Sequence, residues 1–131
     1  MKGKLLLYVV EGIAPILTAL LVWAGALALR QEKEKHKKIA ATHALGTWVS
    51  SIAVVVLTRL GYSMGGKAPD WIMNIHLAII YAIPPWLVLL AMTGLGGKRM
   101  AHMTLAFAYA VLWAAALVTG AMIFMMSHGW M

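Results

Sequence analysis

Five histidines provide most of the reactive chemistry of this 131-residue chain. They lie near the ends of apolar segments, and an ionisable ring at membrane depth is a functional candidate by default because leaving it unbonded is costly. The chain has no cysteine, which excludes disulfides, thiolate metal sites and cysteine nucleophiles. We therefore take the histidines as candidate cofactor ligands: His36, His43, His76, His102 and His128.

Two redox centres use neutral imidazoles of this kind. A b-type haem is ligated by histidines from facing helices, and hydrogen bonds around those ligands adjust its potential. Copper also binds imidazole, and the ten methionines of the chain offer thioether sulfur as a further soft ligand. His76 and His102 are the leading candidates because each is a single polar ring within an apolar segment. His36 lies among charged residues and His128 near the C-terminus, where solvation is the simpler interpretation.

Glu11 is a further polar residue within an apolar segment. A carboxyl group buried there is either protonated or paired with a cation, because burial disfavours its charged form. One interpretation is proton transfer or contact with a quinone. The other is a pairing at the membrane interface with Lys4 or another cation.

The composition predicts an integral membrane protein. Hydrophobic residues make up 63% of the chain and charged residues 11%, which leaves too little polar surface for a soluble domain of this size. Four apolar segments are long enough to span a bilayer, and short connections make neighbouring helices antiparallel. We expect an all-α, up-down four-helix bundle in a single domain, with spans at about 5–29, 39–60, 71–95 and 100–126.

Basic residues predict the orientation of these spans. Seven of the eleven Lys and Arg residues lie in the first and third connections, which the positive-inside rule places in the cytoplasm, with both termini outside. The expected location is a prokaryotic inner membrane. Because the basic residues lie in short connections between apolar segments, we expect lipid as their partner and no nucleic acid. Four tryptophans are expected at the membrane interface: Trp71, Trp86, Trp113 and Trp130.

The second half of the chain resembles a known family. His76, Tyr81 and Pro84, followed by His102, Trp113 and Thr119-Gly120, form a pattern similar to that of the small four-helix membrane proteins that include the CtaM- and YozB-like proteins. The His36-Lys37-Lys38 sequence resembles the basic histidine motif of that family, whereas His43 has no counterpart in it. The resemblance covers about residues 30–125. It implies a role in the maturation of haem-copper oxidases, with His36, His76 and His102 as the metal- or haem-handling residues.

These observations lead to one main prediction and two alternatives. We expect an electron-transfer subunit without catalytic residues that holds one or two b-type haems within a membrane redox complex, with other subunits, and a quinone as a candidate, for partners. His102 with either His43 or His36 would ligate an inner haem, and His76, with His128, would serve an outer site. The alternatives are a copper- or haem-handling assembly factor and a structural membrane subunit whose histidines bond their neighbours.

Overall fold

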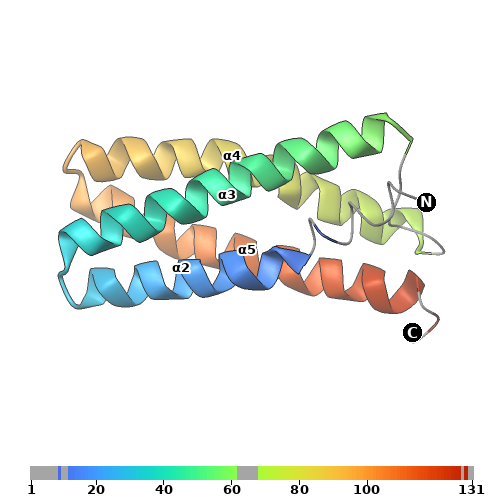
Figure 1. The fold of residues 1–131 in the computed structure, drawn as a ribbon, viewed down its shortest axis with the longest axis horizontal. Coiled ribbons are helices and arrows are strands. Elements are labelled where there is room, and N and C mark those ends of the chain that lie inside the picture. The colour runs from blue at the N-terminus through green and yellow to red at the C-terminus, as the bar shows by residue number, and fades with distance from the viewer. Residues whose placement is uncertain (1–8, 10–11, 62–67, 128, 130–131) are drawn as a thin grey trace. The chain divides into compact units, whose positions relative to one another are not determined.

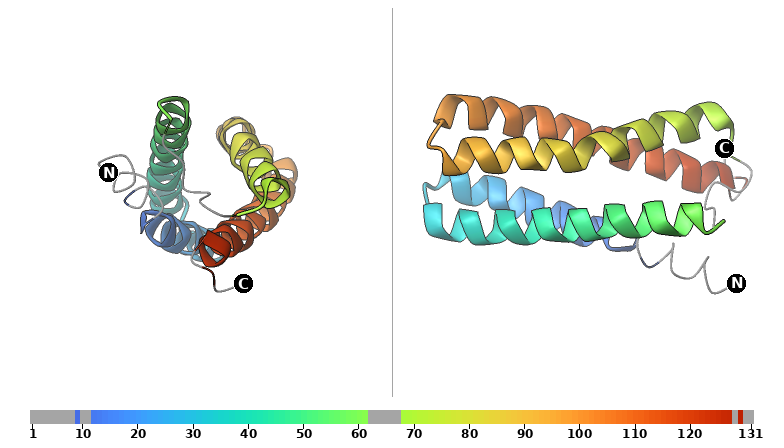
Figure 2. Two further views of the ribbon diagram at one scale, coloured as in Figure 1. Left: turned by 90° about the vertical axis from the view of Figure 1, so that its right-hand side faces the viewer. Right: turned by 90° about the horizontal axis from the view of Figure 1, so that it is seen from above.

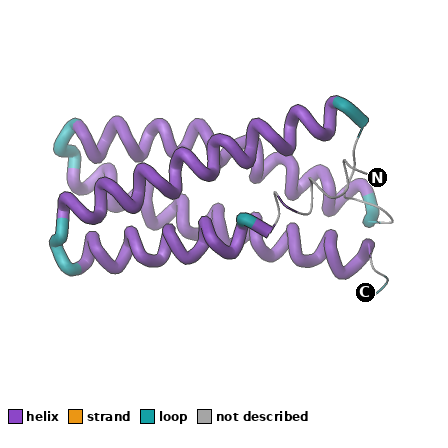
Figure 3. Tube along the Cα trace, in the orientation of Figure 1, coloured by secondary structure: helices purple, strands orange, loops and turns teal. Residues whose placement is uncertain are grey.

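The computed structural model describes residues 9, 12–61, 68–127 and 129. These residues form four helices and no strand, which confirms the all-α fold class (Figures 1 and 3). The helices are α2 (Ala14–Leu29), α3 (Lys33–Arg59), α4 (Asp70–Leu95) and α5 (Arg99–Ser127).

Three of the described helices, α3, α4 and α5, are long and apolar enough to cross a membrane. Large apolar side chains project from them, with Phe107 75% and Val49 66% exposed, as expected for surfaces that contact lipid. Helix α2 has 16 residues, or about 24 Å, and is shorter than a typical hydrocarbon core of about 30 Å. Most of the predicted first span before Ala14 lies outside the described residues.

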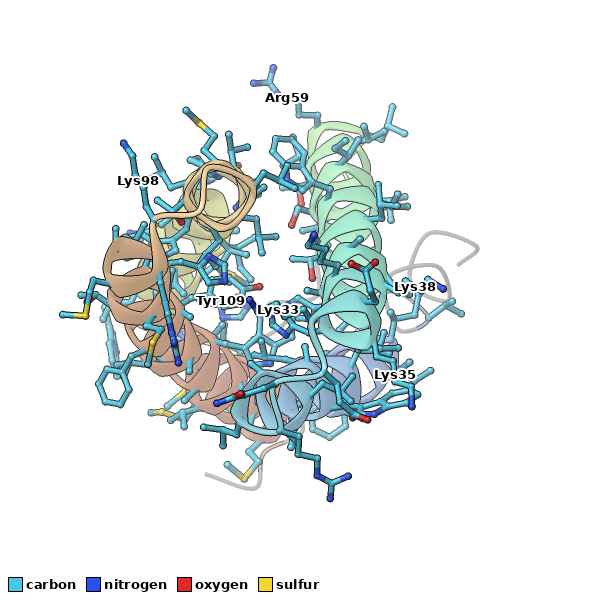
Figure 4. All side chains as sticks on the ribbon, turned by 90° about the vertical axis from the view of Figure 1, so that its left-hand side faces the viewer. Lys33, Lys35, Lys38, Arg59, Lys98 and Tyr109 are labelled. Carbon is cyan, nitrogen blue, oxygen red and sulfur yellow. The ribbon has the colours of Figure 1, made fainter. Side chains whose placement is uncertain are left out.

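Helix α3 begins at Lys33, earlier than the predicted span near Ile39. Four of the five basic residues that were expected in the first connection therefore lie in the first two turns of the helix. Lys and Glu are good helix formers, and pairs three residues apart join Lys35 to Glu32 (3.6 Å) and Lys37 to Glu34 (3.9 Å). The side chains of Lys35 and Lys38 extend away from the start of α3 (Figure 4).

The chain folds as two helical hairpins. Contacts group residues 1–63 in one unit and 64–131 in the other, with α2 against α3 in the first and α4 against α5 in the second (Figures 1 and 2). Each hairpin is antiparallel and closed by a short turn, as the short connections predict. The single-domain organisation stays a prediction.

Both hairpin turns have a left-handed residue after the first helix. In the α4–α5 turn this residue is Gly97 (φ 70°), and in the α2–α3 turn it is Gln31 (φ 60°). The left-handed residue lets the Lys98 N–H bond the Thr93 carbonyl and the Gly97 N–H bond the Gly94 carbonyl, which is the Schellman arrangement. Glycine adopts this conformation freely, whereas glutamine pays a steric penalty.

Candidate cofactor site

In the first hairpin, two histidines of α3 bond to the backbone of α2. Nδ1 of His43 lies 2.8 Å from the Leu17 carbonyl oxygen, and Nδ1 of His36 lies 2.7 Å from that of Ala24. His43 is 2% exposed, whereas His36 is half-buried. The two rings are seven residues apart on one helix, which is about 10 Å along its axis. They therefore join the two helices at two successive levels.

In the second hairpin, His102 of α5 makes the same kind of bond near the turn. Its Nδ1 lies 2.9 Å from the Leu90 carbonyl oxygen and 3.3 Å from the Thr93 hydroxyl. The ring lies against Gly94, where an added Cβ would be 3.0 Å from Cε1 of His102. A glycine on the neighbouring helix thus provides the space for the imidazole.

His76 of α4 bonds to a side chain of α5. Its Nδ1 lies 2.7 Å from Oγ1 of Thr119, and that hydroxyl lies 2.8 Å from the Ala115 carbonyl oxygen. The ring also faces a glycine, since a Cβ on Gly120 would be 3.2 Å from Cε1 of His76. The Thr119-Gly120 pair therefore supplies both the hydrogen-bond partner and the space for this ring.

These partners determine which ring nitrogen carries the proton. A carbonyl oxygen accepts hydrogen bonds and donates none, so Nδ1 must be the donor in neutral His36, His43 and His102. The single proton of the Thr119 hydroxyl goes to a backbone carbonyl, so its oxygen accepts the bond from Nδ1 of His76. In each neutral ring the lone pair is then on Nε2, and this is the arrangement of most metal-ligating histidines.

The predicted site residues lie at two ends of the second hairpin. His76 is level with Gly120, which is 18 residues, or about 27 Å along α5, from His102. The two histidines therefore lie at separate levels of the hairpin, and their assignment to an inner and an outer site stays a prediction. His128 and Glu11 lie outside the described residues, and the pairing of His102 with His43 or His36 stays a prediction. Among the described residues, no three His, Asp, Glu or Cys side chains form a group suited to one metal ion.

Thr47 stands out among the threonines. The other six donate their hydroxyl proton to the carbonyl four residues earlier, as helical threonines commonly do. Thr47 lies one turn after His43, is 3% exposed, and its hydroxyl has no hydrogen-bond partner among the described residues. A buried hydroxyl without a partner is unfavourable, so the polar character of this level of α3 is unusual.

Two of the tryptophans predicted at the membrane interface are tied into the second hairpin. The indole N–H of Trp86 donates to the Leu105 carbonyl (2.9 Å), and Trp113 is 7% exposed and packs against Tyr109. Thr119 was not predicted as the partner of His76, although Gly120 beside it is a usable signal of close helix approach. The carbonyl acceptors were not predicted either, because a backbone oxygen has no sequence signature.

The chain matches no family model, no curated protein and no solved structure. The class of protein is therefore described by its fold and its histidines. The chain is an all-α protein of two helical hairpins, and three of its described helices are long and apolar enough to cross a membrane. Four imidazoles of the described residues are hydrogen-bonded through Nδ1.

Proposed function

We propose that the chain is a membrane electron-transfer subunit that binds b-type haem through Nε2 of its histidines. The carrying observation is that all four described histidines donate Nδ1–H to the neighbouring helix, which leaves the metal-binding lone pair on Nε2. His102 would be a ligand on the inner side and His76 a ligand on the outer side, and the first hairpin would supply His36 or His43 as an inner-side ligand. The α2–α3 and α4–α5 turns, with the basic residues beside them, face the cytoplasm of a prokaryotic cell, and both termini lie outside.

Haem would suit these residues because its iron takes one or two imidazoles from the protein. Haem, when bound, exchanges single electrons between its ferric and ferrous states. The residues of the chain would hold the imidazole planes through their Nδ1 bonds and raise the basicity of the ligand nitrogens. Apolar helices around the ligands would limit access of water. A small subunit of this kind would pass electrons between a quinol pool and a partner subunit.

A second candidate is a structural subunit whose histidines only join helices. The same Nδ1 bonds favour it, because each one ties the two helices of a hairpin together. The two candidates differ in the role of Nε2, which haem ligation uses and a structural bond to Nδ1 does not.

Asparagine variants separate these roles. The side-chain nitrogen of Asn occupies nearly the position of Nδ1, so His102→Asn and His76→Asn keep a donor for the neighbouring helix and remove Nε2. We expect the purified full chain to show the reduced α-band of b-type haem, and each Asn variant to lose the part of it that comes from the haem its histidine would hold, while staying helical. Bound copper without haem would support the assembly-factor alternative against the proposal. A stable chain with neither haem nor copper would leave the structural subunit.

A further inference from the structure

The two hairpins have the same backbone at their turns. A shift of 66 positions takes the end of α2 at Leu29 to the end of α4 at Leu95, and the start of α3 at Lys33 to the start of α5 at Arg99. The left-handed residues Gln31 and Gly97 also correspond. Four backbone hydrogen bonds repeat at this shift. In the first hairpin they are Arg30 N to Ala26 O (3.1 Å), Gln31 N to Ala28 O (3.1 Å), Glu32 N to Leu27 O (3.0 Å) and His36 N to Glu32 O (2.9 Å). In the second hairpin, in the same order, they are Gly96 N to Met92 O (3.0 Å), Gly97 N to Gly94 O (3.4 Å), Lys98 N to Thr93 O (3.0 Å) and His102 N to Lys98 O (2.9 Å).

The histidine bond nearest each turn repeats at the same shift. His36 donates to the carbonyl of Ala24, twelve residues earlier, and His102 donates to that of Leu90, also twelve residues earlier. A helical turn of this kind is common, but it does not require an imidazole five residues after the left-handed residue. The repetition of both ring and acceptor indicates that the two hairpins are copies of one unit.

The hairpins differ one level deeper. At the shift of 66 positions, His43 corresponds to Tyr109 and Thr47 to Trp113. All four are buried, and in the second hairpin the two rings pack with their centroids 6.1 Å apart. An aromatic pair therefore occupies the level at which the first hairpin has an imidazole and a hydroxyl that no described residue bonds. Only the histidine near the turn is common to both hairpins.

We propose that the chain is a tandem repeat of one helical hairpin, in which the histidine near each turn is the haem-ligating residue: His36 in the first hairpin and His102 in the second. This assignment rests on the proposed haem function and decides which histidine of α3 is the haem ligand. His43 then belongs to the first hairpin alone, where it joins α3 to α2 beside Thr47.

Matched asparagine variants test the assignment. Ferric haem is titrated into the full chain and into three variants of it: His36→Asn, His43→Asn and His102→Asn. We expect His36→Asn and His102→Asn to weaken haem binding by the same factor, about tenfold or more, which is at least the effect of losing a group that supports a metal ligand. His43→Asn should leave haem binding unchanged. Loss of haem in His43→Asn with normal binding in His36→Asn would overturn the assignment.

A second measurement uses the wild-type chain, so it tests the assignment even if the variants fail to fold. Nitrogen-15 NMR of labelled histidine, with gallium protoporphyrin as a diamagnetic haem analogue, should shift the Nε2 signals of His36 and His102 together and leave that of His43 in place. If the Nε2 signals of His43 and His102 shift and that of His36 does not, the assignment is refuted but the proposed haem function is not. A wild-type chain that binds neither porphyrin refutes the proposed function itself, so the two failures are distinguishable.

Discussion

The hydrogen bond between His76 and Thr119 allows the sharpest test of how the second hairpin is held. Thr119→Val removes the hydroxyl and keeps the branched shape of the side chain, so packing changes little. The variant leaves Nδ1–H of His76 without the acceptor that lies 2.7 Å away. It also removes the bond from the hydroxyl to the Ala115 carbonyl, but that oxygen keeps its helical backbone partner.

The expected loss of stability is about 1 kcal/mol. An unsatisfied buried donor costs about 1–3 kcal/mol in proteins generally. Side-chain hydrogen bonds between membrane helices contribute less, about 0.6 kcal/mol on average and about 1.7 kcal/mol at most. Thr119 is 9% exposed and its bond is short, which places it in the upper part of the membrane range. A loss of about 1 kcal/mol corresponds to roughly a fivefold change in the unfolding equilibrium constant.

Reversible unfolding in mixed detergent micelles, followed by circular dichroism, measures this difference. Thr119→Ser keeps the hydroxyl and should retain most of the stability. Thr47→Val is the matched control, because it removes a buried hydroxyl that has no partner among the described residues, so it should be neutral or stabilising. If Thr119→Val is as stable as the wild type, or if Thr47→Val costs as much, the reasoning from the hydrogen bond is refuted.

Two further predictions concern the turns and the indole bond. Gln31→Gly should stabilise the first hairpin by about 0.5–1 kcal/mol, because φ is 60° at this position, and Gly97→Ala should destabilise the second hairpin by about 1 kcal/mol. The same unfolding assay measures both variants. A loss of stability in Gln31→Gly would contradict the left-handed turn. Trp86→Phe should cost about 1 kcal/mol, because it removes the donor to the Leu105 carbonyl, and unchanged stability would show that this bond contributes nothing.

The helices could be predicted because length and apolar composition decide them. The end of α4 is an example, since Gly96 and Gly97 follow Leu95 and allow the left-handed turn. Helix α3 extends six residues before the predicted span, because Lys and Glu also form helices in water and apolar composition does not report that part of the helix. The histidines could be singled out as candidates, but their partners depend on which carbonyl faces the ring, and helix packing decides that.

The structural role of these histidines and their proposed cofactor role are compatible, because each role uses a different ring nitrogen. An imidazole that donates Nδ1–H to a carbonyl is held in one orientation and one tautomer, and this is what an axial ligand needs before a metal arrives. A hairpin stabilised by such bonds therefore gains a fixed Nε2 lone pair without any further residue. It follows that asparagine and alanine variants of a haem-ligating histidine should differ: asparagine should weaken haem binding and spare the fold, and alanine should impair both. A histidine whose asparagine variant binds haem normally is a helix-joining residue alone.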